Sequence, residues 1–494
     1  MVRATAYRFS PGTLLEIGLS AFDTSHPGYG VARLDEPSRV LGLPWPLAAC
    51  IALQLLAWTV IPTAATTAID PATMQLGMWG REFGLVQAGH PALASWALDL
   101  AYALFGVHKW VSYGTAEVFL AGATVCIYLA GRVLLDEARA VAAAMPVAGL
   151  GAAAIAFDSR LAMLPFAAAF VFALWQAVET DRARWWIFAA VAAGLGLYAD
   201  LAMGLTLASG ALWILGDAKA RGRFKAGTPY PGVGLLLLFA APLMVALIRA
   251  LGATASPASL RDLGIALASM AAVAVIGGAV GLRAKPAAER VARRRRVYLV
   301  LIGLVPAVIL HDVASLPLLG LALLGLWPRA TSRSGPRMLA AAAAVTLMLA
   351  AGFGWQQYRN FAVGSAPTVF SYPMGHIAHR FEKVWHRATG VPLEIVAGDP
   401  GTAALVGLKA QDFPTMFADL DPRQSPGVTP ERIARDGMLV VWRDGDAWTP
   451  PPALIAGRAT GNVWIRWSKT SPNAARIPFR YAIIPPQVSR QDFR

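Results

Sequence analysis

The sequence predicts a polytopic α-helical membrane protein of about eleven transmembrane helices, followed by a C-terminal extracytoplasmic α/β domain. The first observation is composition: 56% of the 494 residues are hydrophobic and 15% are charged, whereas soluble domains are about a quarter charged. The second is a mean hydropathy of +0.51. The third is that apolar runs of spanning length recur along the chain, with basic residues in the short loops between them. These features exclude a soluble enzyme and a disordered chain.

The first 44 residues are expected to form a cytoplasmic or interfacial segment. Their composition is mixed and polar, and no apolar run begins early enough for a cleavable signal peptide. Residues 13–22 could lie as a short helix on the membrane surface. The two cysteines, Cys50 and Cys126, both lie inside later apolar runs, so no disulfide framework is implied.

Residues 45–355 are expected to form the transmembrane region. Apolar runs close to the ~20 residues needed to span a bilayer lie at 46–64, 111–135, 138–157, 160–178, 184–199, 201–216, 230–250, 262–283, 297–311, 313–327 and 337–355.

The basic residues predict how these spans are oriented. With the N-terminus in the cytoplasm, about 22 of the 43 Lys and Arg residues lie on cytoplasmic segments and about five in the opposite short loops. The net charge of +14 therefore indicates membrane orientation rather than nucleic-acid binding, and the run 293–296 is expected to anchor at lipid headgroups. The extracytoplasmic face then carries the loop 65–110 and the tail 356–494.

The tail is expected to fold as an α/β domain. A helix is predicted at 376–387, strands at 392–398 and 437–442, and a hairpin from strands at 462–467 and 479–484. Thr429 precedes Pro430, which is the pattern of an N-cap followed by Pro at the first helical position. Because the tail contains no glycine-rich phosphate loop or metal-ligand cluster, we expect it to position substrates or recognise an acceptor rather than to catalyse.

The informative ionisable residues gather where spans meet the extracytoplasmic face. Such residues are costly in a membrane and often mark function, so their distribution predicts a site at the membrane boundary. They are Asp70, Glu82, His90, Lys109, Asp158, Asp200, His311 and Asp312.

Structural roles compete with functional ones for several of these residues. Asp70 precedes Pro71 and could simply cap a helix that runs to about residue 83, and Asp158 could cap the following span. His90, between glycine and proline, could be a turn residue. Lys109 could be an interfacial anchor.

Four motifs carry a resemblance to a known family. An extracytoplasmic Asp after the first span is followed by Gly-His-Pro and by an apolar helix that ends in Phe-Gly. Phe-Asp-Ser at 157–159, Arg-Trp-Trp at 184–186 before Gly-Leu-Gly-Leu, and the tail segment 384–399 follow. Together they resemble the polytopic GT-C glycosyltransferases, in the bacterial branch related to protein O-mannosyltransferases and the lipid A aminoarabinose transferase.

The resemblance implies sugar transfer from a polyprenyl-phosphate-linked donor at the outer face of the bacterial cytoplasmic (inner) membrane. The acceptor would be lipid A, core oligosaccharide, another glycan or a protein. A hydroxyl acceptor requires a carboxylate base, and the departing lipid phosphate requires positive charge. The implied base is Asp70, assisted by Asp158 and Glu82 through orientation or through a divalent metal, which Asp70 and Asp158 would hold. The implied phosphate-side residues are His90, Lys109, Arg249 and Arg261.

Two other classes stay open on the sequence alone. A transporter or lipid flippase would favour inverted repeats and midplane charges on broken helices, and neither pattern is evident. A non-catalytic scaffold, whose tail binds an envelope partner, would have a similar sequence.

Overall fold

The computed structural model describes residues 39–40, 42–87, 90–134, 155–251, 335–363, 367–467 and 476–487, together with scattered positions between 137 and 151. Most of the expected N-terminal segment lies outside these residues. So do the expected spans at 262–283, 297–311 and 313–327, most of the span at 138–157, and the residues Arg261, His311 and Asp312.

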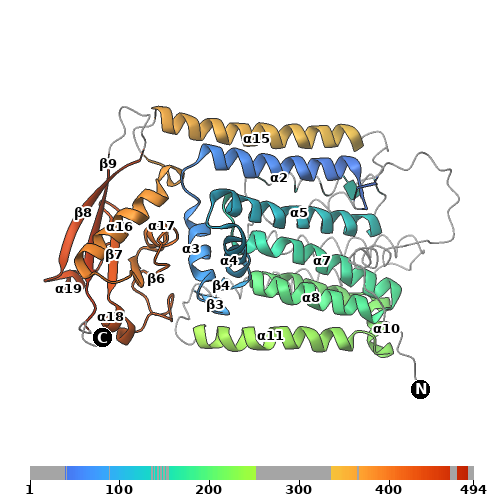
Figure 1. The fold of residues 1–494 in the computed structure, drawn as a ribbon. Coiled ribbons are helices and arrows are strands. Elements are labelled where there is room, and N and C mark those ends of the chain that lie inside the picture. The colour runs from blue at the N-terminus through green and yellow to red at the C-terminus, as the bar shows by residue number, and fades with distance from the viewer. Residues whose placement is uncertain are drawn as a thin grey trace, which may run out of the picture.

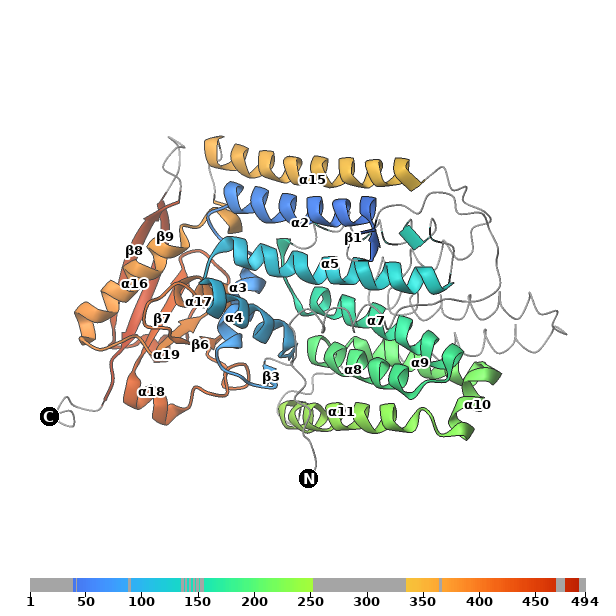
Figure 2. The same cartoon turned by 45° about the vertical axis from the view of Figure 1, so that its right-hand side comes forward.

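Long helices lie side by side and form a bundle (Figures 1 and 2). The first span, α2, packs against both α5 and α15, and α7 packs against α5 and α8. Each helix coincides with an expected apolar run to within a few residues, except that α15 continues to Val363, eight residues past the expected end at 355. The helices are α2 (Trp45–Ala65), α5 (Lys109–Leu134), α7 (Ser159–Thr180), α8 (Ala183–Ala199), α9 (Met203–Gly216), α11 (Tyr230–Leu251) and α15 (Gly335–Val363).

Among the described residues, three helices are long and apolar enough to cross a membrane by themselves: α2, α5 and α7. The short helix α10 (Ala218–Ala226) and α11 meet the same test as a pair that is bent by 90°. Helices α4 (Leu93–Phe105), α8 and α9 are apolar but shorter. The chain is thus a multi-pass helical membrane protein, and the expected count of about eleven spans is not established by the described part of it.

Short elements lie across one end of the bundle (Figure 1). They are α3 (Pro71–Gly80), the two-stranded pair β3 (Val86–Gln87) and β4 (His90–Pro91), and α4 (Leu93–Phe105). A side chain on Gly80 would come 2.5 Å from the backbone oxygen of Ser95, so glycine allows α3 and α4 to pack closely. A small hairpin of β1 (Arg39–Val40) and β2 (Leu43–Pro44) precedes α2.

The tail contains a five-stranded sheet of order β6-β5-β7-β9-β8. Strand β5 is parallel to β6 and β7, whereas β9 is antiparallel to β7 and β8. The predicted strands and the predicted hairpin are confirmed, and β6 is an additional strand. The strands are β5 (Ile395–Gly398), β6 (Thr415–Ala418), β7 (Met438–Arg443), β8 (Ala459–Arg466) and β9 (Arg476–Ile484).

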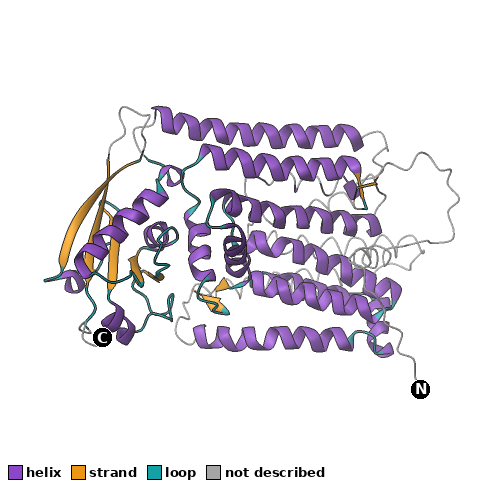
Figure 3. Ribbon diagram, viewed as in Figure 1, coloured by secondary structure: helices purple, strands orange, loops and turns teal. Residues whose placement is uncertain are grey.

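Helices cover both faces of this sheet (Figure 3). Leu439 and Val441 of β7 belong to a core shared with the membrane helices, whereas Met438 and Val440 face a second core. Helices α16 (Met374–Thr389) and α17 (Pro400–Gly407) contribute to the shared core. On the other side lie α18 (Pro430–Asp436) and α19 (Pro452–Ile455). Because one core is continuous from bundle to sheet, the tail is held against the bundle end.

Candidate functional site

The segment that follows α2 is fixed to the first residues of the tail. The backbone N–H groups of Thr67 and Ala68 both donate to the carbonyl oxygen of Phe370, at 2.9 and 3.0 Å. The N–H of Ile69 points at the sulfur of Met374 at 3.3 Å. These contacts join residues some 300 positions apart in the chain, and they place the next residue, Asp70, where bundle and tail meet.

Asp70 caps α3, as one of the two interpretations of the sequence predicts. Its Oδ2 accepts the N–H of Ala72 at 2.9 Å, and Pro71 occupies the first helical position. Burial raises the pKa of Asp70, while the N–H groups at the helix start act in the opposite direction. Burial outweighs the cap, so the pKa of Asp70 is raised overall, and a carboxylate with a raised pKa is a stronger base than an ordinary aspartate.

The structure brings the second predicted acidic turn to the start of α3. The hydroxyl of Thr73 accepts the N–H of Phe157 at 2.9 Å and donates to its carbonyl oxygen at 3.2 Å. Asp158 follows directly and caps α7 through the N–H of Leu161, at 2.8 Å. Asp70 and Asp158 are therefore neighbours at one end of the bundle.

Asp200, at the end of α8, lies beside the same turn. The hydroxyl of Ser159 donates to Oδ2 of Asp200 at 2.5 Å, and Oδ1 accepts the N–H of Ala202 at 2.8 Å. Three helix-end carboxylates thus gather at the bundle end that faces the tail.

Lys109 holds the C-terminal end of α2. Its ammonium donates to the carbonyl oxygens of Thr63, at 2.6 Å, and of Thr66. These carbonyls have no partner inside the helix, so the lysine satisfies them. An ammonium has three N–H donors, which leaves one for another acceptor. One turn along α5, the hydroxyl of Tyr113 lies 3.1 Å from that of Thr66.

Glu82 and His90 lie away from Asp70, contrary to the expectation of one cluster. Asp70 precedes the first residue of the ten-residue helix α3, and Glu82 follows its end, which separates them by roughly 15 Å at 1.5 Å per residue. His90 stacks on Trp79, near the same far end of α3, with ring centroids 6.5 Å apart. The structure therefore divides the predicted residues into two groups, because α3 is rigid and lies between them.

Glu82 meets the tail at that far end. Burial raises its pKa to about 7, and the positive charge of Arg432 only partly opposes this shift. Its Oε1 is buried without a hydrogen-bond partner among the described residues. Arg432 is held in turn by Asp436 and by the hydroxyl of Thr415, at 2.9 Å. The geometry therefore favours Glu82 as a neutral carboxyl at the contact between loop and tail over a role in assisting Asp70.

The structure does not describe the side chains of the remaining predicted residues. The backbone of Arg249 lies in α11, while its side chain, like the whole of Arg261, is outside the described residues. Within the described ranges, no group of three or more His, Cys, Asp or Glu side chains could hold a metal ion. Asp70 and Asp158 are the only two metal ligands that the sequence suggested, and they do not complete such a set.

Polar side chains of the tail lie at the start of α3, next to Asp70. The sequence did not predict that these residues belong to the site. Asp399 caps α17 through the N–H of Thr402, at 3.1 Å, and its Oδ2 is buried without a partner in the described part of the chain. A side chain on Gly401 would lie 3.6 Å from Cβ of Pro71. Arg443 donates to the hydroxyl of Tyr372 at 2.8 Å.

A signal for these tail residues exists in the sequence. Asp399-Pro400 repeats the Asp-Pro helix start at residue 70, and Asp399 follows the carboxyl end of β5. Parallel strands β6 and β7 lie on opposite sides of β5, and ligands commonly bind at the carboxyl ends of strands at such a reversal. The Asp-Pro pattern marks a helix start, and the strand order, which the sequence did not predict, adds that this start lies at such a reversal.

The fold is similar to that of a solved GT-C glycosyltransferase. The chain superposes on ArnT from Cupriavidus metallidurans bound to undecaprenyl phosphate with a TM-score of 0.56 and 13% identity, over 88% of this chain and 97% of that one. The same ArnT in the apo state gives 0.48 and 12% identity, over 88% and 97%. The arabinofuranosyltransferase AftD from Mycobacteria gives 0.47 and 18%, over 90% of this chain and 40% of that one.

The match to a sequence family is more specific than the fold similarity, but it covers a shorter part of the chain. Residues 89–246 match the family of dolichyl-phosphate-mannose-protein mannosyltransferases. No curated protein sequence matches the chain significantly. The resemblance to GT-C glycosyltransferases is thereby confirmed, by sequence for residues 89–246 and by fold for most of the chain.

Proposed function

We propose that this protein is a membrane glycosyltransferase that moves a sugar from a polyprenyl-phosphate-linked donor to a cell-envelope acceptor. The observation that carries the proposal is the position of Asp70, a half-buried carboxylate of raised pKa between the membrane bundle and the tail, with Asp158 at the same bundle end. Lipid A, core oligosaccharide, another glycan or a protein would supply the acceptor hydroxyl.

The two substrates would approach Asp70 from opposite sides. The donor's hydrocarbon chain stays in the bilayer, so its phosphate and sugar reach the bundle end from the membrane side. A hydroxyl that displaces the phosphate with inversion must attack from the opposite side of the anomeric carbon, which is the side of the tail. This geometry requires the base to stand between membrane and tail, as Asp70 does.

The reaction would then need one proton transfer and one displacement. Asp70 accepts the proton of the acceptor hydroxyl as its oxygen forms a bond to the anomeric carbon. The bond between that carbon and the phosphate oxygen breaks, and the electron pair leaves with the lipid phosphate. The third N–H of Lys109, which its contacts to the end of α2 leave over, would donate to the developing anion. Asp158 and Asp200 would keep the surrounding helix ends in position.

The tail would supply the acceptor side of the site. Asp399, Tyr372 and Arg443 offer acceptors and donors of hydrogen bonds next to the start of α3. Such groups suit the hydroxyls of a saccharide, because a buried carboxylate oxygen without a partner is costly and a ligand hydroxyl would satisfy it.

We propose that the tail faces the extracytoplasmic side of a bacterial cytoplasmic membrane. The helix α10 lies at the end of the bundle away from the tail (Figure 1), and it carries Lys219, Arg221, Arg223 and Lys225. Basic residues favour the cytoplasmic side. The same rule would place the N-terminus in the cytoplasm.

The variant Asp70→Asn tests the proposed base. Asparagine caps helices as well as aspartate, so α3 should be retained, while transfer should fall about a hundredfold or more through loss of the base. The measurement is mass spectrometry of envelope glycolipids from cells that lack the gene and carry either the wild type or the variant.

A matched control separates the base from the cap. Asp217 caps α10 through the N–H of Ala220, at 2.9 Å, far from the tail. Asp217→Asn should leave transfer near the wild-type level. Near-normal transfer by a folded Asp70→Asn protein would refute the assignment and favour Asp158 as the base.

A further inference from the structure

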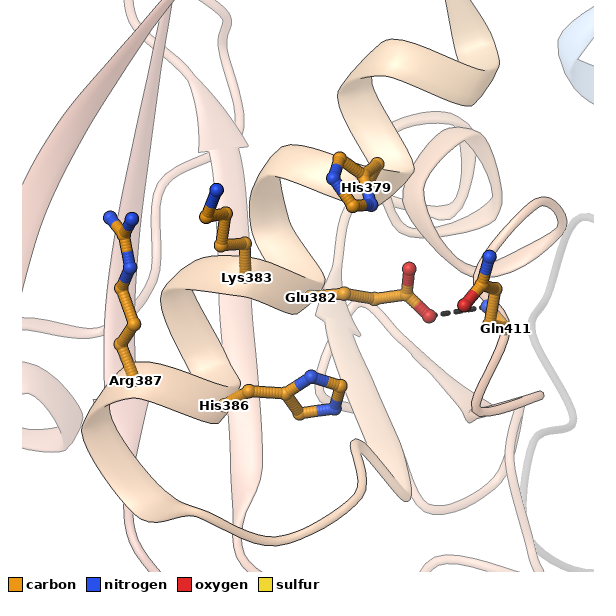
Figure 4. A pocket seen from close by; sticks show the side chains of 6 residues that line it. All are labelled: His379, Glu382, Lys383, His386, Arg387 and Gln411. Atoms are coloured by element: carbon orange, nitrogen blue, oxygen red, sulfur yellow. Dashed lines mark hydrogen bonds between the residues drawn. The ribbon is translucent and has the colours of Figure 1, made fainter.

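A pocket of about 360 Å³ lies on the tail, apart from the carboxylates at the bundle end (Figure 4). Five of its lining residues come from α16, and the sixth, Gln411, comes from the loop before β6. The α16 residues are His379, Glu382, Lys383, His386 and Arg387.

Four basic side chains line the pocket because of helical spacing. Counted from His379, the residues Lys383, His386 and Arg387 are four, seven and eight positions further on, which places them on one face of a helix. The opposite face of α16 is fully buried, with Phe381 and Trp385 in the core. The helix therefore cannot rotate to separate these basic side chains, which stay together in an unfavourable arrangement of like charges.

The acidic groups nearby are committed to other partners. Glu382 accepts the backbone N–H groups of Gln411 and of Asp412, the latter at 3.1 Å. Asp412 accepts the N–H of Leu393 at 2.7 Å and pairs with Nε2 of His386 at 2.6 Å. Among the described residues, no ion pair involves Lys383 or Arg387. Both are exposed at the pocket.

The loop that closes the pocket is tied to the membrane end of the molecule. Lys409 donates to the carbonyl oxygen of Val107, between α4 and α5. Arg81 donates to the carbonyl oxygen of Leu408 at 3.0 Å and stacks over Phe413. The pocket is therefore a preformed feature of the folded tail rather than the surface of a loose loop.

We propose that this pocket binds a phosphate group. Two cations without an acidic partner, at a site whose own carboxylate is held by backbone N–H groups, would be stabilised by an anion with several acceptor oxygens. The imidazole of His379 adds a further donor, whereas Nε2 of His386 is already paired with Asp412. The phosphate belongs either to an anionic lipid headgroup or to a soluble phosphate ester, and the proposal does not depend on the transferase activity.

Hydrogen exchange of the full chain in lipid nanodiscs tests this proposal. One arm uses phosphatidylcholine nanodiscs titrated with inorganic phosphate, and the other replaces part of the lipid with phosphatidylglycerol. We expect protection of α16 and of the loop around Gln411 in at least one arm. The double variant K383Q/R387Q and each single variant should need about tenfold more phosphate or phosphatidylglycerol for half-maximal protection, or should lose the protection.

The exposed Arg380 provides the matched control, because it lies on the same helix outside the pocket. R380Q should bind like the wild type, and thermal unfolding should show that all variants are folded. Protection by inorganic phosphate supports a soluble ester, and protection only with phosphatidylglycerol supports a lipid headgroup. The proposal is overturned if neither probe protects these segments, or if R380Q weakens binding as much as K383Q/R387Q.

Discussion

Glu82→Gln should stabilise the protein at alkaline pH and leave its stability almost unchanged at about pH 4, where the carboxyl is protonated in both the folded and the unfolded chain. Glu82 has a pKa of about 7 in the folded protein, raised from 4.5 by burial, and one carboxyl oxygen lacks a partner among the described residues. The folded state therefore prefers the protonated form. A glutamine resembles that neutral form in size and charge, so it should substitute for it at this contact.

The magnitude follows from proton linkage. Between pH 4.5 and 7 the unfolded chain releases this proton and the folded chain retains it, so the free energy of unfolding falls as the pH rises. Below this window both states are protonated, and above it both are ionised. A difference between 4.5 and about 7 corresponds to an upper bound of roughly 3 kcal/mol at 1.36 kcal/mol per unit. Glutamine removes this loss above pH 7.

Thermal unfolding in detergent at about pH 4 and about pH 8.5, on either side of this window, measures the effect. The melting temperature of the wild type should fall by several degrees more than that of Glu82→Gln between the two conditions. Glu431 is fully exposed beside Arg432, so Glu431→Gln is the matched control and should follow the wild type. Equal pH dependence of the wild type and Glu82→Gln would refute a protonated, buried Glu82.

Three further predictions follow from the structure. Lys109→Met should lower the free energy of unfolding by about 1–3 kcal/mol, because it leaves the last carbonyls of α2 without a donor; an unchanged melting temperature would contradict this role. Gly80→Ala should cost about 1–3 kcal/mol by overpacking α3 against α4, whereas Gly204→Ala, which meets open space, should be close to neutral in the same unfolding assay. In intact cells an impermeant thiol reagent should label Thr460→Cys in the tail but not Gly222→Cys in α10; the reverse pattern would invert the proposed topology.

Local rules account for the features that the sequence predicted well. Asp70, Asp158 and Thr429 cap the helices that follow them, because a cap depends on a side chain and an N–H two or three residues away. Apolar runs likewise mark the membrane helices, since each run must bury its own backbone polar groups in lipid. The strands of the tail are visible for a similar reason, as runs of β-branched and aromatic residues.

Contacts between distant segments account for what the sequence missed. The strand β6 is only four residues long and is recognisable as a strand through its pairing with β5. The buried contact between Gln54 of α2 and Glu117 of α5, at 2.9 Å, also depends on how two helices are rotated about their axes. Neither feature has a periodic pattern of its own.

The sequence by itself determined that this is a membrane protein and which segments form the helices of the bundle. It also determined where these helices begin and that acidic residues gather at helix ends. Hydropathy, periodicity and capping act over a few residues, so they can be read directly. Only the tertiary structure decided that Asp70 and Asp158 are neighbours, that Glu82 and His90 are separated from them by the length of α3, and that Asp399 of the tail faces the same end. Such neighbours are set by packing between segments far apart in the chain, because one rigid helix can hold two nearby residues apart while a shared core brings distant ones together.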